Sequence, residues 1–463
     1  MKSNLPRSKF AVLVFATLTA LVGLAQAQEP NWTNAAYQDA AWEGRGCTND
    51  ARGQWFRDAK FGAFIHFGLY SELGGYWQGK GPYDPSEQIM GLGQREQVIP
   101  WEQYQKEVGG AFNPTNFNAK EWVSLVKKAG QKYIIVTTKH HDGFAMFHTA
   151  TTRFNVVDST PFARDVIKEL ADECQRQGIV FCPYYSLGDW SAADVMDRKF
   201  ASYQDYMRTQ LQELFQNYGP IKMIWLDNYW YVKDQWQNDL AHAKELYAFI
   251  HSISPNTLID DRVGGGAGST DGDYTTPENQ LEGARQSRYF EVVMSDTVDD
   301  NWGWVKNATN YRKPGDLICN LIDCASKGGN FVLNVGPTAS GEFPKEHVAI
   351  LEVIGKWTSI NGEAIYGTTP APECEVEAGG PFVCYSTKNA RNVFLHVTNW
   401  PKEDGAGVVR IARIGLVGVE MVDGALGKVE YGSAVEDGKT VLKIKKPAQI
   451  DPYATVLRLT FRE

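Results

Sequence analysis

The sequence predicts an α/β protein: a (β/α)8-like barrel, with one degenerate or missing element, followed by a C-terminal β-sandwich. Between about residues 60 and 361, short apolar segments alternate with segments of helical period, the pattern of parallel βαβ units. After about residue 370 only short β-like stretches and turns remain. Polar side chains directly follow the apolar segments, at the barrel end where such folds carry their functional groups.

The barrel region contains seven predicted strands, each a short apolar run. They lie at residues 61–67, 133–139, 180–185, 222–226, 257–260, 290–294 and 331–335, and helices are predicted at 118–129, 165–177, 203–218, 239–253, 316–326 and 345–360. Asn118 and Glu121 have the spacing of a capping box, and Gly178 suits the end of the second helix. A doubly wound open sheet is the alternative, but no G-x-G-x-x-G motif indicates a dinucleotide site.

The chain divides into a signal peptide (1–27), the barrel (28–365) and the sandwich (366–463). The first part has a basic start, an apolar run at 10–24, and Ala-Gln-Ala at 25–27. The apolar run is short for a membrane span, and no later stretch is long enough. We therefore expect an exported protein, periplasmic or secreted, cleaved after Ala27 and without a membrane anchor. The sandwich strands are predicted at 382–386, 392–398, 408–411, 417–421, 440–444 and 455–460.

Charge and cysteine content exclude some classes of function. The formal net charge is -9 without long runs of one sign, which argues against a nucleic-acid partner. Seven cysteines leave at least one unpaired, and Cys374 with Cys384 are placed to staple a hairpin of the sandwich. Most of the others are expected to be buried free thiols.

The strand ends carry His66, then Lys-His-His-Asp at 139–142, and later Asp227 and Arg262. The adjacent histidines 140 and 141 raise the question of a metal. Neighbouring strand residues point to opposite faces, so the two histidines cannot both face the barrel axis unless the strand has already ended, and no H-x-H motif is present. We therefore predict neither a metal nor a cofactor, and instead a pair of carboxylates suited to acid–base hydrolysis.

Asp227 is the strongest candidate for the ionised carboxylate, because it directly follows the apolar strand residues 224–226, which would hold it rigidly. The second carboxylate must be protonated to assist a leaving group. Glu278, in a loop after the fifth strand, and Glu291, at the start of the sixth, both remain open for that role.

These residues belong to longer segments that resemble glycoside hydrolase family 29, the α-L-fucosidases. The matching segments are 55–68, 133–144, 184–190, 225–227, 261–262, 272–278, 301–304 and 327–337, in the family's order across about 280 residues. The segments 133–144 and 327–337 are the most specific for the family. The resemblance implies a retaining exo-α-L-fucosidase that acts by double displacement on a fucosylated oligosaccharide or glycoconjugate.

The resemblance also implies roles for individual residues. Asp227 is the expected nucleophile, and Glu278 is favoured over Glu291 as the acid/base. In retaining enzymes the two carboxyl groups lie about 5–5.5 Å apart. The expected contacts to fucose hydroxyls and ring are His66, His140, His141, Tyr185 and Arg262, and the expected apolar wall for the C5 methyl is Trp225 with Trp302. Many family members carry a Glu-Trp pair after the first strand; here Trp77 stands in for the tryptophan, and the stretch 74–78 has no acid.

Two alternatives remain open to the sequence. One is a related retaining barrel hydrolase that acts on fucan fragments or galactosides, which the missing acid motivates. The other is a catalytically inactive fucose-binding protein, although both expected carboxylates are present. For the sandwich, we expect packing against the barrel rather than glycan binding.

Overall fold

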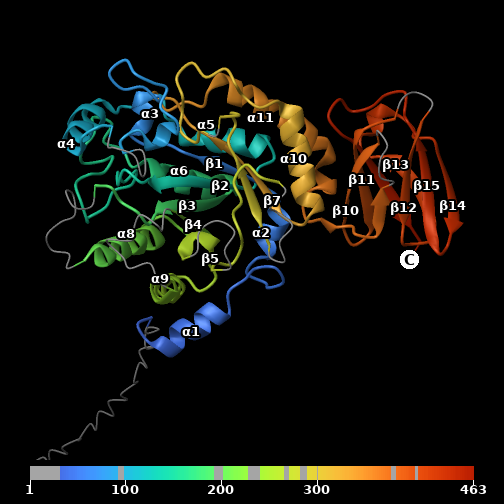
Figure 1. Cartoon of the computed structure of the whole chain (residues 1–463), viewed down its shortest axis with the longest axis horizontal. Helices are drawn as coiled ribbons and strands as arrows, with labels where there is room; N and C mark the ends of the chain where they lie inside the picture. The colour runs from blue at the N-terminus through green and yellow to red at the C-terminus, as the bar shows by residue number, and fades with distance from the viewer. Residues whose placement is uncertain are drawn as a thin grey trace, which may run out of the picture.

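The computed structural model describes residues 32–91, 98–191, 202–227, 240–264, 271–281, 289–299, 301–376, 382–401 and 405–462. The predicted signal peptide, residues 1–27, lies outside the described residues. Within the described part, no helix has the length and apolarity needed to cross a membrane. The chain forms a barrel with a separate pair of β-sheets beside it, drawn in red in Figure 1.

The barrel is built on a parallel sheet whose seven strands all coincide, within two residues at each end, with the seven predicted ones. They are β1 (Phe61–Ile65), β2 (Tyr133–Lys139), β3 (Val180–Ser186), β4 (Met223–Asp227), β5 (Leu258–Ile259), β6 (Glu291–Met294) and β7 (Asn330–Val335). Their order in the sheet is β5-β4-β3-β2-β1-β7-β6. Nearly every strand residue is buried, as expected for strands covered on both faces.

An irregular segment, residues 273–279, lies between the two edge strands of this sheet. Parallel bridges join Tyr274 to Asp260 on one side, and Thr275 to Phe290 and Glu278 to Val293 on the other. Backbone hydrogen bonds accompany them, including Asp273 N to Ile259 O at 2.7 Å. The segment therefore takes the place of the degenerate eighth strand and closes the ring, and it carries Glu278 into the barrel wall.

Helices cover the outside of the barrel (Figure 1). The long helices are α5 (Ala119–Lys128), α6 (Val166–Gln177), α8 (Tyr203–Asn217), α9 (Leu240–Ile253), α10 (Pro314–Ser326) and α11 (Lys345–Asn361). Shorter helices include α1 (Ala35–Glu43), α2 (Gln54–Ala59), α3 (Tyr70–Leu73), η1 (Ser86–Gln88), α4 (Trp101–Gln103), η2 (Tyr104–Gly109) and η4 (Asp261–Val263). The predicted caps are confirmed: Asn118 Oδ1 accepts from Glu121 N at 3.3 Å, and Gly178 takes φ 75° at the end of α6.

Side chains alternate between the inside of the barrel and its helical shell. Phe64, Tyr184 and Trp225 belong to the apolar cluster that fills the barrel interior. Tyr185, one residue further along β3, belongs to the cluster between the sheet and the helices. This alternation is the period of two of a β-strand, and it determines which strand residues reach the barrel axis.

The C-terminal part is a sandwich of two antiparallel sheets, of order β13-β16-β11-β10-β8 and β14-β15-β12-β9. The strands are β8 (Thr369–Pro370), β9 (Cys374–Val376), β10 (Val383–Lys388), β11 (Asn392–Asn399), β12 (Ala406–Ile411), β13 (Leu416–Met421), β14 (Tyr431–Glu436), β15 (Lys439–Lys445) and β16 (Thr455–Phe461). The strands β8, β9 and β14 were not predicted from the sequence, and the six residues of β14 are all exposed and carry no buried pattern. All seven cysteines are free thiols, so the predicted staple between Cys374 and Cys384 is absent.

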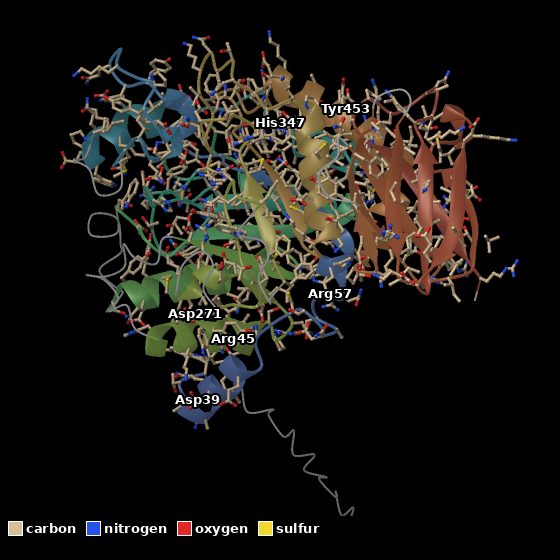
Figure 2. All side chains as sticks on the ribbon, turned by 45° about the vertical axis from the view of Figure 1, so that its right-hand side comes forward. Asp39, Arg45, Arg57, Asp271, His347 and Tyr453 are labelled. Carbon is tan, nitrogen blue, oxygen red and sulfur yellow. The ribbon has the colours of Figure 1, made fainter. Side chains whose placement is uncertain are left out.

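The sandwich packs firmly on the barrel, as expected. Phe394 and Val456 of the sandwich share one buried cluster with residues of α10 and α11. The Trp357 indole N–H donates to Ala454 O at 3.2 Å across the same junction. Figure 2 shows Tyr453 at this seam, and Figure 1 shows α10 between the barrel and the red sheets.

Candidate active site

Asp227 ends β4 at the carboxyl-terminal mouth of the barrel, where three side chains converge on it. Tyr184 Oη donates to its Oδ2 at 2.9 Å, and Arg262 Nη1 donates to its Oδ1 at 2.9 Å. His141 Nε2 lies 3.7 Å from Oδ2. The Asp227 side chain keeps 16% of its surface exposed, so one edge of the carboxylate is open to a ligand.

The environment keeps Asp227 ionised. Burial by itself would raise the pKa of this carboxyl, but Arg262, then His141, and the hydrogen bonds from Arg262 and Tyr184 outweigh burial and lower the pKa below its ordinary value. A carboxylate that is charged, oriented by two donors and held at the end of a buried strand has the properties of a nucleophile.

Arg262 joins the two candidate carboxylates. Its Nη1 binds Asp227, and its Nη2 donates to Glu278 Oε1. Its guanidinium lies over the Trp225 ring, 4.3 Å from the centroid. Although burial works to lower the pKa of Arg262, Glu278 and Asp227 raise it, so the side chain stays charged. Next to Arg262 in sequence, Asp261 accepts at its Oδ1 from Thr276 Oγ1 at 2.6 Å.

The structure separates the two candidates for the second carboxylate. Glu278 has 39% of its side chain exposed and contacts the same guanidinium as Asp227, so the two carboxyl groups lie within the span of one arginine head group. Glu291 is fully buried inside the barrel, where its carboxylate accepts from Tyr133 Oη and from Trp225 Nε1 at 3.2 Å. Glu278 can reach a ligand at the mouth, and Glu291 lies beneath Trp225.

Burial raises the pKa of Glu291 to about 7, and the hydrogen bonds from Tyr133 and Trp225 oppose that rise. A raised pKa is the property sought in a general acid. Here, however, its cause is enclosure in the barrel core rather than a position beside the reacting bond. The raised pKa of Glu291 therefore reports its burial and is not by itself evidence for a catalytic role.

Three histidines line the mouth as neutral imidazoles. Burial lowers the pKa of His66 to about 3 and that of His141 to about 4, and it lowers the pKa of His140 as well. His66 Nδ1 lies 2.7 Å from Asn334 Oδ1, and His141 Nδ1 lies 2.7 Å from Ser186 Oγ. His140 Nδ1 has no hydrogen-bond partner among the described residues. Each ring can therefore offer a donor or an acceptor to a hydroxyl group.

The prediction for Tyr185 needs correction. Its hydroxyl donates to Gln210 Oε1 at 2.7 Å, and its ring lies against Lys139, both outside the barrel interior. Tyr184 is the tyrosine at the site, because β3 points it inward, toward Asp227. Because the two residues are neighbours on one strand, a prediction that is wrong by one residue selects a side chain on the opposite face of the sheet.

The tryptophans differ in their contacts with the other aromatic side chains at the mouth. Trp225 stacks on Tyr184 with centroids 5.6 Å apart. Trp302 lies beside His66, at 5.7 Å between ring centroids. Trp77 lies further out, in a loop where its backbone pairs with Lys80 and its ring is only partly buried. Trp190, which was not among the predicted site residues, packs on His141 with ring centroids 5.5 Å apart.

Glu87 is a buried carboxyl that was not among the predicted site residues. Its Oε2 accepts from the backbone N–H groups of Trp302 and Gly303 at 3.1 and 3.0 Å. Its Oε1 has no partner among the described residues, and burial raises its pKa to about 7. Glu87 thus holds the loop that presents Trp302. It follows no predicted strand, so the pattern of polar strand ends could not find it.

Together these groups bring to the mouth of the barrel one ionised carboxylate, a second carboxyl nearby, neutral imidazoles and indole faces. Across the described part of the chain, no group of three or more His, Cys, Asp or Glu side chains is arranged to hold a metal ion. The arrangement suits two-carboxylate chemistry on a sugar, whose hydroxyls need hydrogen bonds and whose apolar faces stack on aromatic rings.

Comparison with known proteins agrees with this chemistry. The sequence model of the family described as alpha-L-fucosidase matches residues 24–363. The chain is 29% identical to the alpha-L-fucosidase of Dictyostelium discoideum over 88% of this chain and 92% of that protein. It is 29% identical to the tissue alpha-L-fucosidase of Homo sapiens, over 75% and 76% of the two chains.

Solved structures agree in the same way. The alpha-L-fucosidase from Vibrio sp. strain EJY3 superposes with a TM-score of 0.77 at 28% identity, covering 90% of this chain and 74% of that one. A family 29 alpha-L-fucosidase from Bacteroides thetaiotaomicron, trapped as a covalent intermediate with 2-fluoro-fucosyl fluoride, superposes with a TM-score of 0.76 at 25% identity, covering 90% and 98%.

Proposed function

The chain belongs to the α-L-fucosidase family of retaining glycoside hydrolases, and on that premise we propose that Asp227 is its nucleophile and Glu278 its acid/base. The enzyme releases terminal α-L-fucose from glycans with retention of configuration. The observation that carries the assignment of residues is the single guanidinium of Arg262, which binds Asp227 through one nitrogen and Glu278 through the other.

The reaction then proceeds in two displacements. In the first, the Glu278 carboxyl donates its proton to the glycosidic oxygen while Asp227 Oδ attacks C1, so the bond to the aglycone breaks and a fucosyl ester of Asp227 forms. In the second, the Glu278 carboxylate takes a proton from water, and that water attacks C1 and releases Asp227. A substrate that enters between the carboxylates displaces Glu278 from Arg262 and frees it to carry a proton.

The pocket wall supports recognition of a deoxy sugar. The neutral rings of His66, His140 and His141 offer hydrogen bonds to hydroxyl groups without placing a cation beside C1. The indole faces of Trp225 and Trp302 offer an apolar surface to the C5 methyl. Because a methyl group in an apolar pocket contributes only about 1–3 kcal/mol, the hydroxyl contacts must carry much of the specificity.

We also propose that residues 1–27 direct export and are removed after Ala27. The basic start, the apolar run and the Ala-Gln-Ala site support this. N-terminal sequencing of the mature protein is the check, and a chain that keeps residues 1–27 would contradict it.

The test of the catalytic assignment uses an aryl α-L-fucoside, with proton NMR of the released sugar at early times. We expect α-L-fucose as the first product, and its loss in Asp227→Ala. Asp172→Ala is the matched control, because Asp172 is 61% exposed on the barrel surface and should leave turnover unchanged. The indole faces, which the C6 hydroxyl would meet, also predict that the aryl α-L-galactoside turns over about 10- to 200-fold more slowly.

Either of two results would overturn the assignment. β-L-fucose as the first product would mean inversion, which excludes a covalent intermediate on Asp227. Full activity in Asp227→Ala would mean that another residue attacks C1. Tight fucose binding with no turnover of aryl fucosides or fucosylated oligosaccharides would support a binding protein instead.

A further inference from the structure

A second cavity lies at the opposite end of the barrel from Asp227. Its volume is about 530 Å³, and its lining includes Lys60 just before β1, Phe290 just before β6, and Pro370 of β8. It therefore opens at the amino-terminal ends of the strands, between the barrel and the C-terminal sheets. Figure 2 shows Arg57, another lining residue, at this boundary.

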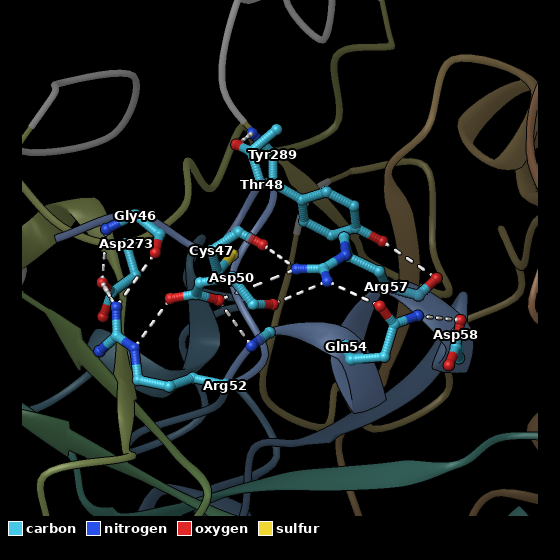
Figure 3. A network of polar contacts seen from close by, with 11 residues as sticks. Gly46, Cys47, Thr48, Asp50, Arg52, Gln54, Arg57, Asp58, Asp273 and Tyr289 are labelled. Atoms are coloured by element: carbon cyan, nitrogen blue, oxygen red, sulfur yellow. Dashed lines mark hydrogen bonds and ion pairs between the residues drawn. The ribbon is translucent and has the colours of Figure 1, made fainter.

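The cavity is cationic in a chain whose formal net charge is -9. Arg57, Lys60 and Lys327 line it, and Asp58 is the only acidic residue in the lining. Asp58 Oδ1 is occupied, because it accepts from Gln54 Nε2 at 2.8 Å, as Figure 3 shows. Three cations against one carboxylate in a shared concavity favour an anionic ligand.

Two of the three cations already have partners. Arg57 Nη2 donates to Asp50 O at 2.7 Å, within the network of Figure 3. Lys327 Nζ forms an ion pair with Asp323 Oδ2 at 2.6 Å. Neither cation needs a further anion to be satisfied.

Lys60 is different. It is 2% exposed, and the one hydrogen bond of its Nζ among the described residues goes to Tyr289 Oη at 3.5 Å, with no carboxylate within ion-pair distance there. Its backbone has φ 56°, which a lysine adopts only when the surroundings impose it. A buried ammonium with a single long hydrogen bond is unfavourable, because it has lost its hydration without gaining a counter-ion.

We propose that this cavity binds a small tetrahedral oxyanion, inorganic phosphate or sulfate, with Lys60 as its main charge partner. Thr48 Oγ1 accepts from Tyr289 N at 3.2 Å, which leaves the hydroxyl proton available to such an anion. Lys327, at the more exposed side, adds a second cation. The bound anion would complete the contact between the barrel floor and β8, far from the catalytic carboxylates.

Binding should be coupled to a proton. Burial lowers the pKa of Lys60 to about 8, with Arg57 acting in the same direction and with Asp58 and Cys324 opposing. An oxyanion beside Nζ would favour the charged amine and raise this pKa. Above about pH 8, where part of Lys60 is neutral in the free protein, anion binding should therefore take up protons.

The test measures the thermal midpoint of the full mature protein in sodium phosphate, in sodium sulfate, and in sodium chloride at equal ionic strength. We expect a saturable rise of several degrees in phosphate or sulfate and none in chloride, because an anion that binds only the folded state stabilises it. Lys60→Met should abolish the rise. Lys345→Met is the matched control, since Lys345 is 92% exposed elsewhere, and it should keep the rise in full.

Calorimetry at pH 8.5 supplies a second measurement. Titration with phosphate in two buffers of different ionisation enthalpy should reveal proton uptake in the native protein. If Lys60→Met fails to fold, Lys327→Met should still bind, with affinity reduced about tenfold. An equal response to chloride, an unchanged response in Lys60→Met, or binding without proton uptake would overturn the proposal.

Discussion

The barrel and the C-terminal sandwich differ in what they bury. The barrel encloses charged side chains, among them Lys139 and Asp189, which form an ion pair at 3.0 Å with both side chains fully buried. In the described part of the sandwich, the buried polar side chains are threonines and one histidine, whose pKa burial lowers to about 3. The sandwich core is otherwise aliphatic and aromatic.

This difference indicates that the barrel mouth governs catalysis and that the sandwich core mainly governs stability. A buried charge is unfavourable unless it is paired, and the pair of Arg262 with Asp227 orients the carboxylate at the mouth. Apolar burial in the sandwich stabilises the fold in proportion to the buried area, but it does not orient particular side chains. Substitutions in the barrel mouth should therefore change turnover, and those in the sandwich core should change unfolding.

Glu278→Ala should produce the largest contrast. We expect kcat/KM for a fucosylated oligosaccharide to fall by about 10³-fold, because its leaving group needs a proton. The loss should be much smaller for an aryl fucoside whose leaving group is already acidic, and added azide should accelerate turnover. Glu420→Ala, at a side chain 61% exposed on the sandwich, is the control and should leave both substrates unaffected. Equal losses on both substrates would contradict the acid/base role.

Arg262→Met should come next, with a fall in kcat/KM of about 10²-fold. Arg262 lowers the pKa of Asp227, so its removal should raise that pKa and move the acidic limb of the kcat/KM profile to higher pH. Arg410→Met, at a side chain 44% exposed on the sandwich, should not move it. An acidic limb at the wild-type pH would mean that Arg262 does not set the ionisation of the nucleophile.

Glu291→Gln should cost less than about tenfold in kcat/KM, because the amide can keep the hydrogen bond to Trp225. The main effect of this substitution should be on the pH dependence of the free energy of unfolding. Burial raises the pKa of Glu291 from 4.5 to about 7, so the folded state holds the proton more tightly. That stabilisation is complete below about pH 4.5 and is lost as the pH rises to about 7.

Denaturant unfolding of Glu291→Gln across this pH range should therefore show a flatter dependence than the wild type. A wild-type slope would contradict the buried-acid interpretation. A loss of turnover as large as that of Glu278→Ala, in a folded protein, would reopen Glu291 as the acid/base.

Leu457→Ala should have the smallest effect on turnover. Leu457 is fully buried in the sandwich core, and its truncation should reduce the free energy of unfolding of that region by about 2–5 kcal/mol. The kcat/KM of the folded enzyme should stay unchanged. Val435→Ala, at a 65% exposed position of β14, is the control for stability. A drop in kcat/KM at full folding would show that the sandwich takes part in catalysis.

The sequence by itself predicted the strands of the barrel, the change to a β-domain, and the position of Asp227 at a strand end. Local patterns suffice for these predictions, because β1 to β7 are short apolar runs. The functional side chains of a barrel lie at the carboxyl-terminal ends of its strands, where Asp227 stands. The strand β14 escaped detection because it has no buried face to leave a pattern.

Only the tertiary structure shows that Tyr184 rather than Tyr185 faces Asp227, that Glu278 lies at the mouth while Glu291 is buried, and that Glu87 holds the loop of Trp302. The choice between neighbouring residues on β3 depends on which face the closed sheet turns inward, which a run of buried residues does not reveal. The choice between the glutamates depends on segment 273–279, which becomes a barrel strand only because β5 and β6 leave a gap for it. These are long-range contacts, and no local period in the sequence encodes them.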